Sequence, residues 1–258
     1  KGEEVRKDAV IYVYGHYVTG VTVNVALADD IQKTRGHVIA TYICDNPEIW
    51  ADERMFVTED LVNPYCFIAK DENVVVGIKV VLRENEDKSQ ARFFESLEES
   101  FDKLTSGTWT FVLLRNLHKA TINSEEFDFT VKRSITISET LTAKVCSGEL
   151  IDGERDWVEV LEDSTYNRKI VKIDTENLNS GNIFQNSGNL TIRGVVFADS
   201  EGVGIVNNKG NAQFTLTENS TIQGYKTTAI TAGTGIVIIE GSNILSCESN
   251  IVKITDDA

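Results

Sequence analysis

Three stretches of the sequence decide the fold: IFQNSGNLTI at 183–192, IVNNKGNAQFTL at 205–216 and ITAGTGIVII at 230–239. Each stretch begins with isoleucine, has glycine as its sixth residue, and continues into a run that alternates or is wholly apolar. The leading isoleucines are 22 and 25 residues apart, and Ile251 follows 21 residues after the third. A period of this length indicates stacked copies of one supersecondary unit.

The apolar residues after the three glycines align between copies. Each copy has two of them at a spacing of two, which places both on one face of a strand: Leu190 and Ile192, Phe214 and Leu216, Val237 and Ile239. A further apolar position follows five or six residues later, at Phe197, Ile222 and Ile244. Gly and Asn between the strands, such as Asn186 and Asn207-Asn208, suit tight bends.

This pattern predicts a mainly β protein whose C-terminal part is a parallel β-helix with three strands per turn and about five turns. A leucine-rich repeat of similar period requires a regular leucine framework, whereas residues 180–258 contain three leucines. A β-sandwich also has regular short strands, but it does not require the same sequence to return at each turn.

A capping helix and a separate N-terminal domain are also predicted. The run from Ser89 has phenylalanine and leucine at helical steps, which predicts a helix over 90–104. We expect this helix to cover the first turn, because the end of a repeat fold exposes apolar side chains and unpaired strand edges. Strand-like runs before it, including a hairpin closed near Thr19-Gly20, predict a small antiparallel, sandwich-like domain at 1–88. The β-helix then occupies 89–258.

Composition narrows the classes of function. A net charge of −15 argues against nucleic acid as a partner, since such binding needs a basic face. No apolar run is long enough to span a membrane. The acidic surface is compatible with Ca²⁺, but the sequence has no EF-hand-type loop, and we assign no cofactor.

The four cysteines are too few for a disulfide scaffold. Cys44 and Cys66 lie on neighbouring strand-like runs, and their pairing stays open. Cys146 and Cys247 are expected to be small core residues. The chain begins at Lys1 rather than methionine, which predicts a longer precursor.

The order of the predicted helix, SGTWTFVLL at 106–114, GNLTIRGVVF at 188–197 and NAQFTLTENSTIQG at 211–224 resembles the pectin-lyase-like right-handed parallel β-helix. It is similar to coils of bacterial cell-surface and adhesin-like proteins of the Bacteroides type. The resemblance covers about 90–258 and implies an extracellular or cell-surface location. The superfamily includes pectate lyases, polygalacturonases, phage tailspikes and non-catalytic adhesins, so the fold does not fix the function.

The repeats offer few candidates for catalysis. Arg193 is the best candidate for the base of a lyase, with Asp199 and Glu201 as its nearest acidic residues. The alternative, which we favour, is an outward-facing strand residue followed by a solvated turn. The adjacent aspartates and the histidines that polygalacturonase-like sequences carry in their coils are missing from the regular repeats.

Two further surface features are predicted. Glu218 and Glu240 align in successive turns, either as an acidic ladder or as two exposed glutamates. Trp157, Tyr166 and Tyr225 either stack on the sugar rings of a ligand or pack at a corner or domain junction.

The sequence therefore favours a non-catalytic cell-surface or secreted protein that serves in adhesion, glycan binding or display. Its partner would be a glycan or a surface protein. The alternatives are a polysaccharide lyase or glycoside hydrolase, and a purely structural stalk segment.

Overall fold

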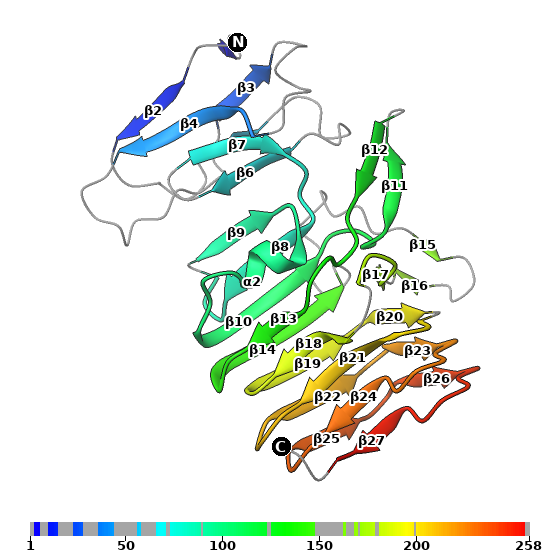
Figure 1. Cartoon of the computed structure of the whole chain (residues 1–258). Coiled ribbons are helices and arrows are strands. Elements are labelled where there is room, and N and C mark those ends of the chain that lie inside the picture. The colour runs from blue at the N-terminus through cyan, green and yellow to red at the C-terminus, as the bar shows by residue number, and fades with distance from the viewer. Residues whose placement is uncertain are drawn as a thin grey trace. The chain divides into compact units, whose positions relative to one another are not determined.

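The computed structural model describes residues 3–5, 10–14, 23–27, 36–43, 56–57, 66–70, 73–88, 90–122, 125–147, 162–163, 168–169, 171–178, 181–198 and 200–255. These residues form a mainly β protein with several parallel sheets and the short helix α2 (Figure 1). The chain divides into two compact units, Lys1–Glu95 and Ser96–Ala258, with the division a little beyond the boundary predicted at residue 88.

The first unit contains two sheets and a hairpin. Its strands are β1 (Glu3–Val5), β2 (Ile11–Tyr14), β3 (Val23–Leu27), β4 (Val38–Ile43), β5 (Phe56–Val57), β6 (Cys66–Lys70), β7 (Asn73–Gly77), β8 (Val81–Asn85) and β9 (Ala91–Phe94). One sheet has the order β1-β3-β5 and the other the order β2-β4-β7-β6, while β8 and β9 pair with each other. Val25 and Phe56 of the first sheet share one core with Ile39 and Val74 of the second.

The prediction that this unit is antiparallel is wrong. β2 pairs in parallel with β4, and β3 pairs in parallel with both β1 and β5, whereas β7 is antiparallel to β4 and β6. The predicted hairpin of β2 and β3 does not form, since the two strands belong to different sheets. Its turn near Thr19-Gly20 lies outside the described residues. Alternation of apolar residues shows which face of a strand is buried, but not which strand lies beside it.

The predicted helix over 90–104 is shorter in the structure. Helix α2 spans Leu97–Phe101, and the residues before it form β9 instead. Ser96 is the N-cap of α2, because its hydroxyl accepts a hydrogen bond of 3.1 Å from the Glu99 amide. Ser96 and Glu99 have the S-x-x-E spacing of a helix N-terminus, so the cap defines a later start than the apolar spacing predicts.

Helix α2 packs on the beginning of the second unit. The Phe101 ring stacks on the Phe111 ring with centroids 3.7 Å apart and an interplanar angle of 5°. The Phe184 ring lies 6.2 Å from Phe101 at a tilt. Because Leu97 and Phe101 are both buried, the helix covers apolar residues of this unit with its apolar face.

Three sheets of parallel strands form most of the second unit. The first contains β10 (Ser106–Leu113), β14 (Thr140–Ser147), β19 (Asn189–Arg193), β22 (Gln213–Thr217) and β25 (Ile236–Ile239). The second contains β17 (Val171–Ile173), β20 (Val195–Ala198), β23 (Thr221–Gln223) and β26 (Asn243–Leu245). The third contains β13 (Ile135–Ile137), β18 (Gly181–Asn186), β21 (Val203–Asn208), β24 (Ile230–Ala232) and β27 (Val252–Ile254).

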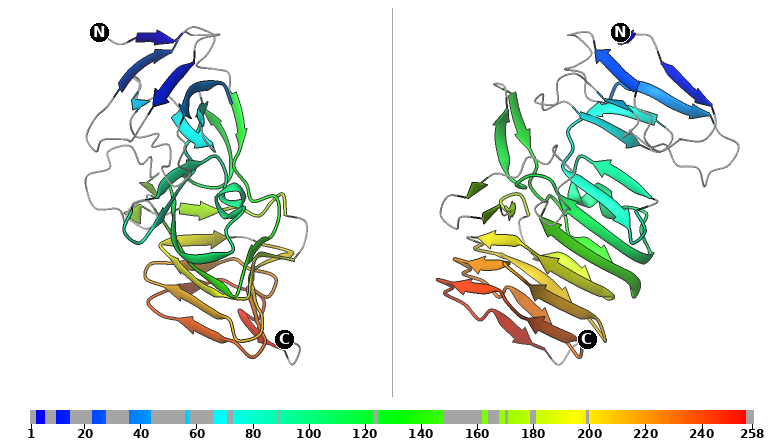
Figure 2. Two further views of the ribbon diagram at one scale, coloured as in Figure 1. Left: turned by 90° about the vertical axis from the view of Figure 1, so that its left-hand side faces the viewer. Right: turned by 180° about the vertical axis from the view of Figure 1, so that it is seen from behind.

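The chain visits these three sheets in rotation. After β10 it makes a single parallel bridge from Leu117 to Ile173 of β17, and then it forms β13. Every later circuit adds one strand to each sheet, so that five levels are stacked, as the two views in Figure 2 show. Five is the number of turns that the sequence predicts. The first circuit is interrupted by the antiparallel pair β11 (Lys119–Ile122) and β12 (Glu125–Asp128), and the second by β15 (Glu162–Asp163) and β16 (Arg168–Lys169).

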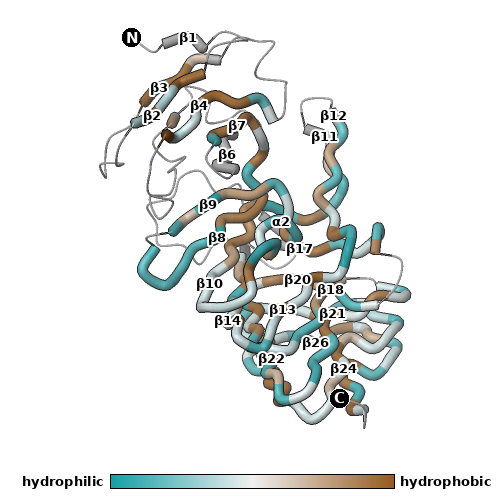
Figure 3. The backbone as a smooth tube through the Cα atoms, turned by 60° about the vertical axis from the view of Figure 1, so that its left-hand side comes forward, coloured by the Kyte–Doolittle hydropathy of each residue, from teal (hydrophilic) through white to brown (hydrophobic). Residues whose placement is uncertain are grey.

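The predicted alignment of the inward residues is confirmed in two sheets. Leu190 pairs with Phe214, which pairs with Val237, and the second apolar residue of each strand follows in the same register. Phe197 likewise pairs with Ile222, which pairs with Ile244. Hydrophobic stretches therefore recur from level to level (Figure 3), and full burial of each large side chain contributes about 2–3 kcal/mol.

The predicted alignment of the leading isoleucines is wrong at the third copy. Ile230 pairs with Val206, not with Ile205, and its other partner is Val252 rather than Ile251. The Ile205 amide donates instead to the Ala229 carbonyl. The repeat in the third sheet therefore has steps of 22, 24 and 22 residues. A similar block of letters can shift by one residue because the backbone, not the first letter, sets the register.

Asn186 and Asn208 are not bend residues, as the sequence suggested, but core residues at the ends of β18 and β21. Both side chains are fully buried. Asn186 Nδ2 donates to Asn208 Oδ1 at 2.7 Å, and Asn208 Nδ2 donates to the carbonyls of Ala212 at 2.8 Å and Ile236 at 3.2 Å. These amides satisfy backbone groups at one corner of the stack, and they link three successive levels.

Candidate functional site

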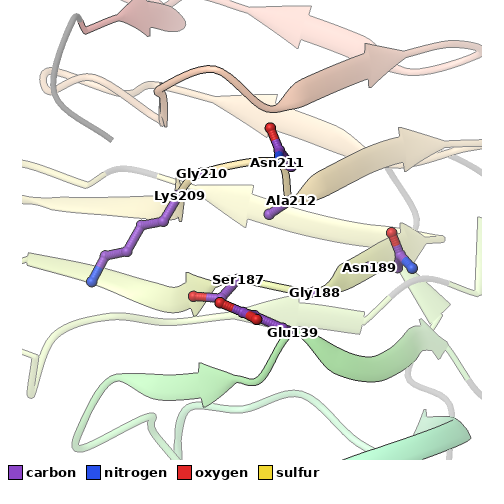
Figure 4. Close-up of a pocket in the computed structure, with 8 residues that line it drawn as sticks. All are labelled: Glu139, Ser187, Gly188, Asn189, Lys209, Gly210, Asn211 and Ala212. Atoms are coloured by element: carbon purple, nitrogen blue, oxygen red, sulfur yellow. The ribbon is translucent and has the colours of Figure 1, made fainter.

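A polar pocket of 460 Å³ lies at the corner between the third and first sheets of the second unit. We name it the corner pocket. It is lined by Glu139, Ser187, Gly188, Asn189, Lys209, Gly210, Asn211 and Ala212. Figure 4 shows that these residues come from the corners of three successive levels: the turn from β13 to β14, the turn from β18 to β19, and the turn from β21 to β22.

Two glycines shape the corner pocket for different reasons. A Cβ on Gly188 would lie 2.2 Å from the Ser138 carbonyl oxygen and 2.4 Å from the Leu141 carbonyl oxygen, so glycine is needed for close approach of two levels. Gly210 has open space around it but a φ of +52°, so glycine is needed there for the backbone conformation. The repeated glycine of the sequence thus sets the floor of the pocket.

The polar groups of the corner pocket are of several kinds. Glu139, Asn189, Lys209 and Asn211 are exposed, and Ser187 is half-buried. Asn189 Nδ2 donates a long hydrogen bond of 3.4 Å to Thr142 Oγ1. Carboxylate, ammonium, hydroxyl and amide groups around one cavity supply both donors and acceptors. Such a set matches the hydroxyl groups of a sugar, and the volume lies within the range of small-ligand sites.

The structure does not bring the predicted lyase residues together. Arg193 Nη2 pairs with Glu218 Oε2 at 2.5 Å, and its Nε is buried without a hydrogen-bond partner. Glu201 pairs instead with Lys226, whose hydrogen bond and charge lower the pKa of the Glu201 carboxyl. Asp199 lies outside the described residues. The described members of the predicted set therefore belong to two separate ion pairs.

Of the three aromatic candidates for sugar stacking, Tyr225 is described and is fully buried. Its hydroxyl has no hydrogen-bond partner. Burial, and secondarily Cys247, raise the pKa of Tyr225 far above its usual value. The ring thus presents no face to a ligand, and the prediction for this residue is wrong, because its position reads as outward only from the irregular turn before it. Trp157 and Tyr166 lie outside the described residues.

The predicted acidic ladder of Glu218 and Glu240 does not form. The Glu240 amide donates to the Leu216 carbonyl, and Thr217 Oγ1 donates to Glu240 Oε1 at 3.3 Å, so Glu240 lies beside Thr217. Glu218 is aligned with a glycine of the next level, since the Cβ of Gly241 would approach Glu218 Cα at 3.7 Å. The sequence alignment is out of step by one residue here because Glu218 belongs to the corner and not to the strand.

The remaining cysteine and histidine predictions have mixed outcomes. Cys146 is a buried free thiol, as expected, whereas Cys247 is half-buried. Cys44 lies outside the described residues, so its pairing with Cys66 stays a prediction. His118 is half-buried at a bend, where its Nδ1 lies 3.4 Å from the Asn116 carbonyl.

Sequence reasoning missed the corner pocket, although a signal was present. Ser187 and Lys209 occupy the same fifth position of the repeated block, just before its glycine. Within the described part of the chain, no three His, Cys, Asp or Glu side chains are grouped so that they could hold a metal ion. Over the same residues, no helix has the length and apolar character to cross a membrane.

Comparison of this chain with protein-family models, with curated proteins and with solved structures finds no match.

Proposed function

We propose that the second unit is a right-handed parallel β-helix of the pectin-lyase-like type, with α2 as its cap. The rotation of the chain through three parallel sheets supports the β-helix, because each circuit returns to the same sheet one level further on. A right-handed winding is the strong preference of parallel strands joined by crossovers. The packing of Phe101 on Phe111 and Phe184 supports the cap.

On this scaffold the proposed function is non-catalytic glycan binding at the cell surface or outside the cell. The observation that carries the proposal is the corner pocket, where five polar side chains of different kinds surround one cavity. The involvement of Arg193 and Glu201 in separate ion pairs favours binding over lyase chemistry. The stalk alternative has no such pocket to account for.

Binding of the whole chain to a panel of neutral, acidic and amino-sugar glycans tests the proposal. We expect Lys209→Ala and Asn189→Ala each to weaken the best binder about tenfold, which corresponds to one lost hydrogen bond to a charged or polar group. Lys253→Ala is the matched control, because it removes an exposed lysine on β27 that does not line the pocket.

Equal weakening by Lys209→Ala and Lys253→Ala would show a non-specific charge effect and reject the corner pocket. Turnover of a pectic or alginate substrate that is abolished by Arg193→Ala would replace binding by lyase chemistry.

A further inference from the structure

The last level of the second unit exposes positions that are core positions in the level before it. Ile222 and Ile230 are fully buried, but their partners on the next strands, Ile244 and Val252, are 44% and 38% exposed. The Ala232 position changes in the same way, since its partner Ile254 is 78% exposed. Inward side chains of this level therefore have a neighbouring level on one side alone among the described residues.

Apolar character also extends around the rim of this level. Three outward positions carry Gln213, Thr215 and Gln223 in the preceding level, and their partners are Ile236, Ile238 and Leu245. These three apolar side chains are exposed. An outward position gains nothing from an apolar residue in water, so the substitution is expected where another surface covers the rim.

The strand edges of this level are open as well. β25, β26 and β27 pair with β22, β23 and β24 on one side, and no described strand lies along their other side. Rows of free N–H and C=O groups are thus presented by all three sheets at once. Such edges bind further strands unless they are blocked.

The exposed apolar area is near that of a protein interface. The six side chains named above expose about as much surface as three whole residues, which is roughly 500 Å² of one patch. A stable dimer buries about 800 Å² per partner, and the three strand edges supply further area.

We propose that this end, defined by β25, β26 and β27, joins a second copy of the same chain end to end about a two-fold axis. The second copy presents the same three edges with the same spacing. A two-fold axis perpendicular to the stack reverses the strand direction, so that edge meets edge as antiparallel pairs and the interface is closed.

The charge distribution favours this mode of approach. The whole chain has a net charge of −15, so two copies repel each other over most of their surfaces. Residues 233–255 contain Glu240, Glu248 and Lys253 as their charged residues, a net charge of −1. Asp256 and Asp257 follow in the sequence, and added salt is therefore expected to strengthen the association.

Sedimentation equilibrium of the whole chain at rising concentration tests the proposal, with a 28.6 kDa monomer as the reference. We expect a dimer whose dissociation constant rises at least about tenfold in Val252→Lys and in Ile236→Lys. The first variant changes the open core and the second changes the rim, where folding does not depend on the side chain. Asn211→Lys adds the same charge at an exposed corner and is expected to leave the dimer unchanged.

Hydrogen exchange supplies the second readout. Amides of 236–239 and 252–254 are expected to become more protected as the dimer forms. A monomer at about 100 μM in both low and high salt overturns the proposal, and so does a dimer that neither variant weakens. Growth into larger assemblies overturns the two-fold arrangement, because it requires a head-to-tail contact.

Discussion

The buried amides of the corner stack predict a large loss of stability in Asn208→Ala. Asn208 donates to the carbonyls of Ala212 and Ile236 and accepts a hydrogen bond from Asn186. Alanine removes all three hydrogen bonds. At about 1 kcal/mol each, the free energy of unfolding is expected to fall by about 3 kcal/mol.

The neighbouring residue provides a control of the same type. Asn207 faces outward on the same strand, and its side chain donates one partly buried hydrogen bond of 3.1 Å to Gln185. Asn207→Ala is expected to cost about 0.5 kcal/mol, because solvent replaces the lost partner. The two variants therefore remove the same atoms from adjacent positions, and they differ in burial.

The assay is hydrogen exchange of the whole chain in increasing urea, read by mass spectrometry on separate segments. Exchange of residues 205–217 reports on the second unit, and exchange of residues 36–43 in the first unit is the internal reference. Separate readouts matter because a chain of two units need not unfold in one step. Equal losses in the two variants, or a loss below about 1 kcal/mol in Asn208→Ala, would refute the role of the buried amides.

Three more predictions concern single residues of the second unit. Tyr225→Phe is expected to keep or raise the free energy of unfolding in urea, because the buried hydroxyl has no partner; since burial raises the pKa of Tyr225 in the folded state, the wild type should also lose stability as pH rises above the ordinary tyrosine value of 10.0, and a variant as alkali-sensitive as the wild type would contradict this. Gly188→Ala should cost more than about 3 kcal/mol and Gly210→Ala about 1 kcal/mol, since one Cβ meets two carbonyls and the other meets open space; thermal unfolding that ranks them in reverse would contradict the close approach. Ser246 has a φ of +51°, beside Gly224 at +64°, so Ser246→Gly should raise the melting temperature by relieving about 1 kcal/mol of strain, and a fall would show that serine is favoured there by contacts instead.

The inward residues of the repeat were the most predictable part of the fold. Leu190, Phe214 and Val237 share a strand register that follows from their spacing, because a strand has one side-chain period and a parallel neighbour repeats it. The third sheet was less predictable, since Ile230 lies one residue out of step with the repeated letters. The direction of pairing in the first unit could not be predicted, because alternation in β2 and β3 does not specify a partner.

The position of α2 was predictable in principle. The apolar spacing indicates a helix, and the capping pair Ser96 and Glu99 defines where it starts. The buried role of Asn186 and Asn208 was harder to predict, since asparagine in a polar run is more typical of turns. Two stacked asparagines at a spacing of 22 residues are nevertheless a signal, because a bend tolerates many residues whereas a buried amide needs its partner.

The candidate site shows where a repeat sequence can carry function. Inward positions must fill the core at every level, and the glycine of each block must allow a close approach or a left-handed backbone, so these positions vary little in chemistry. The fifth position of the block faces solvent at the corner and is Ser187, Lys209 and Thr234 in successive copies. Departures from the repeat at solvent-facing corners are therefore more informative about ligands than the repeat itself. Lys209 is such a departure, and it lies in the pocket on which the proposed function depends.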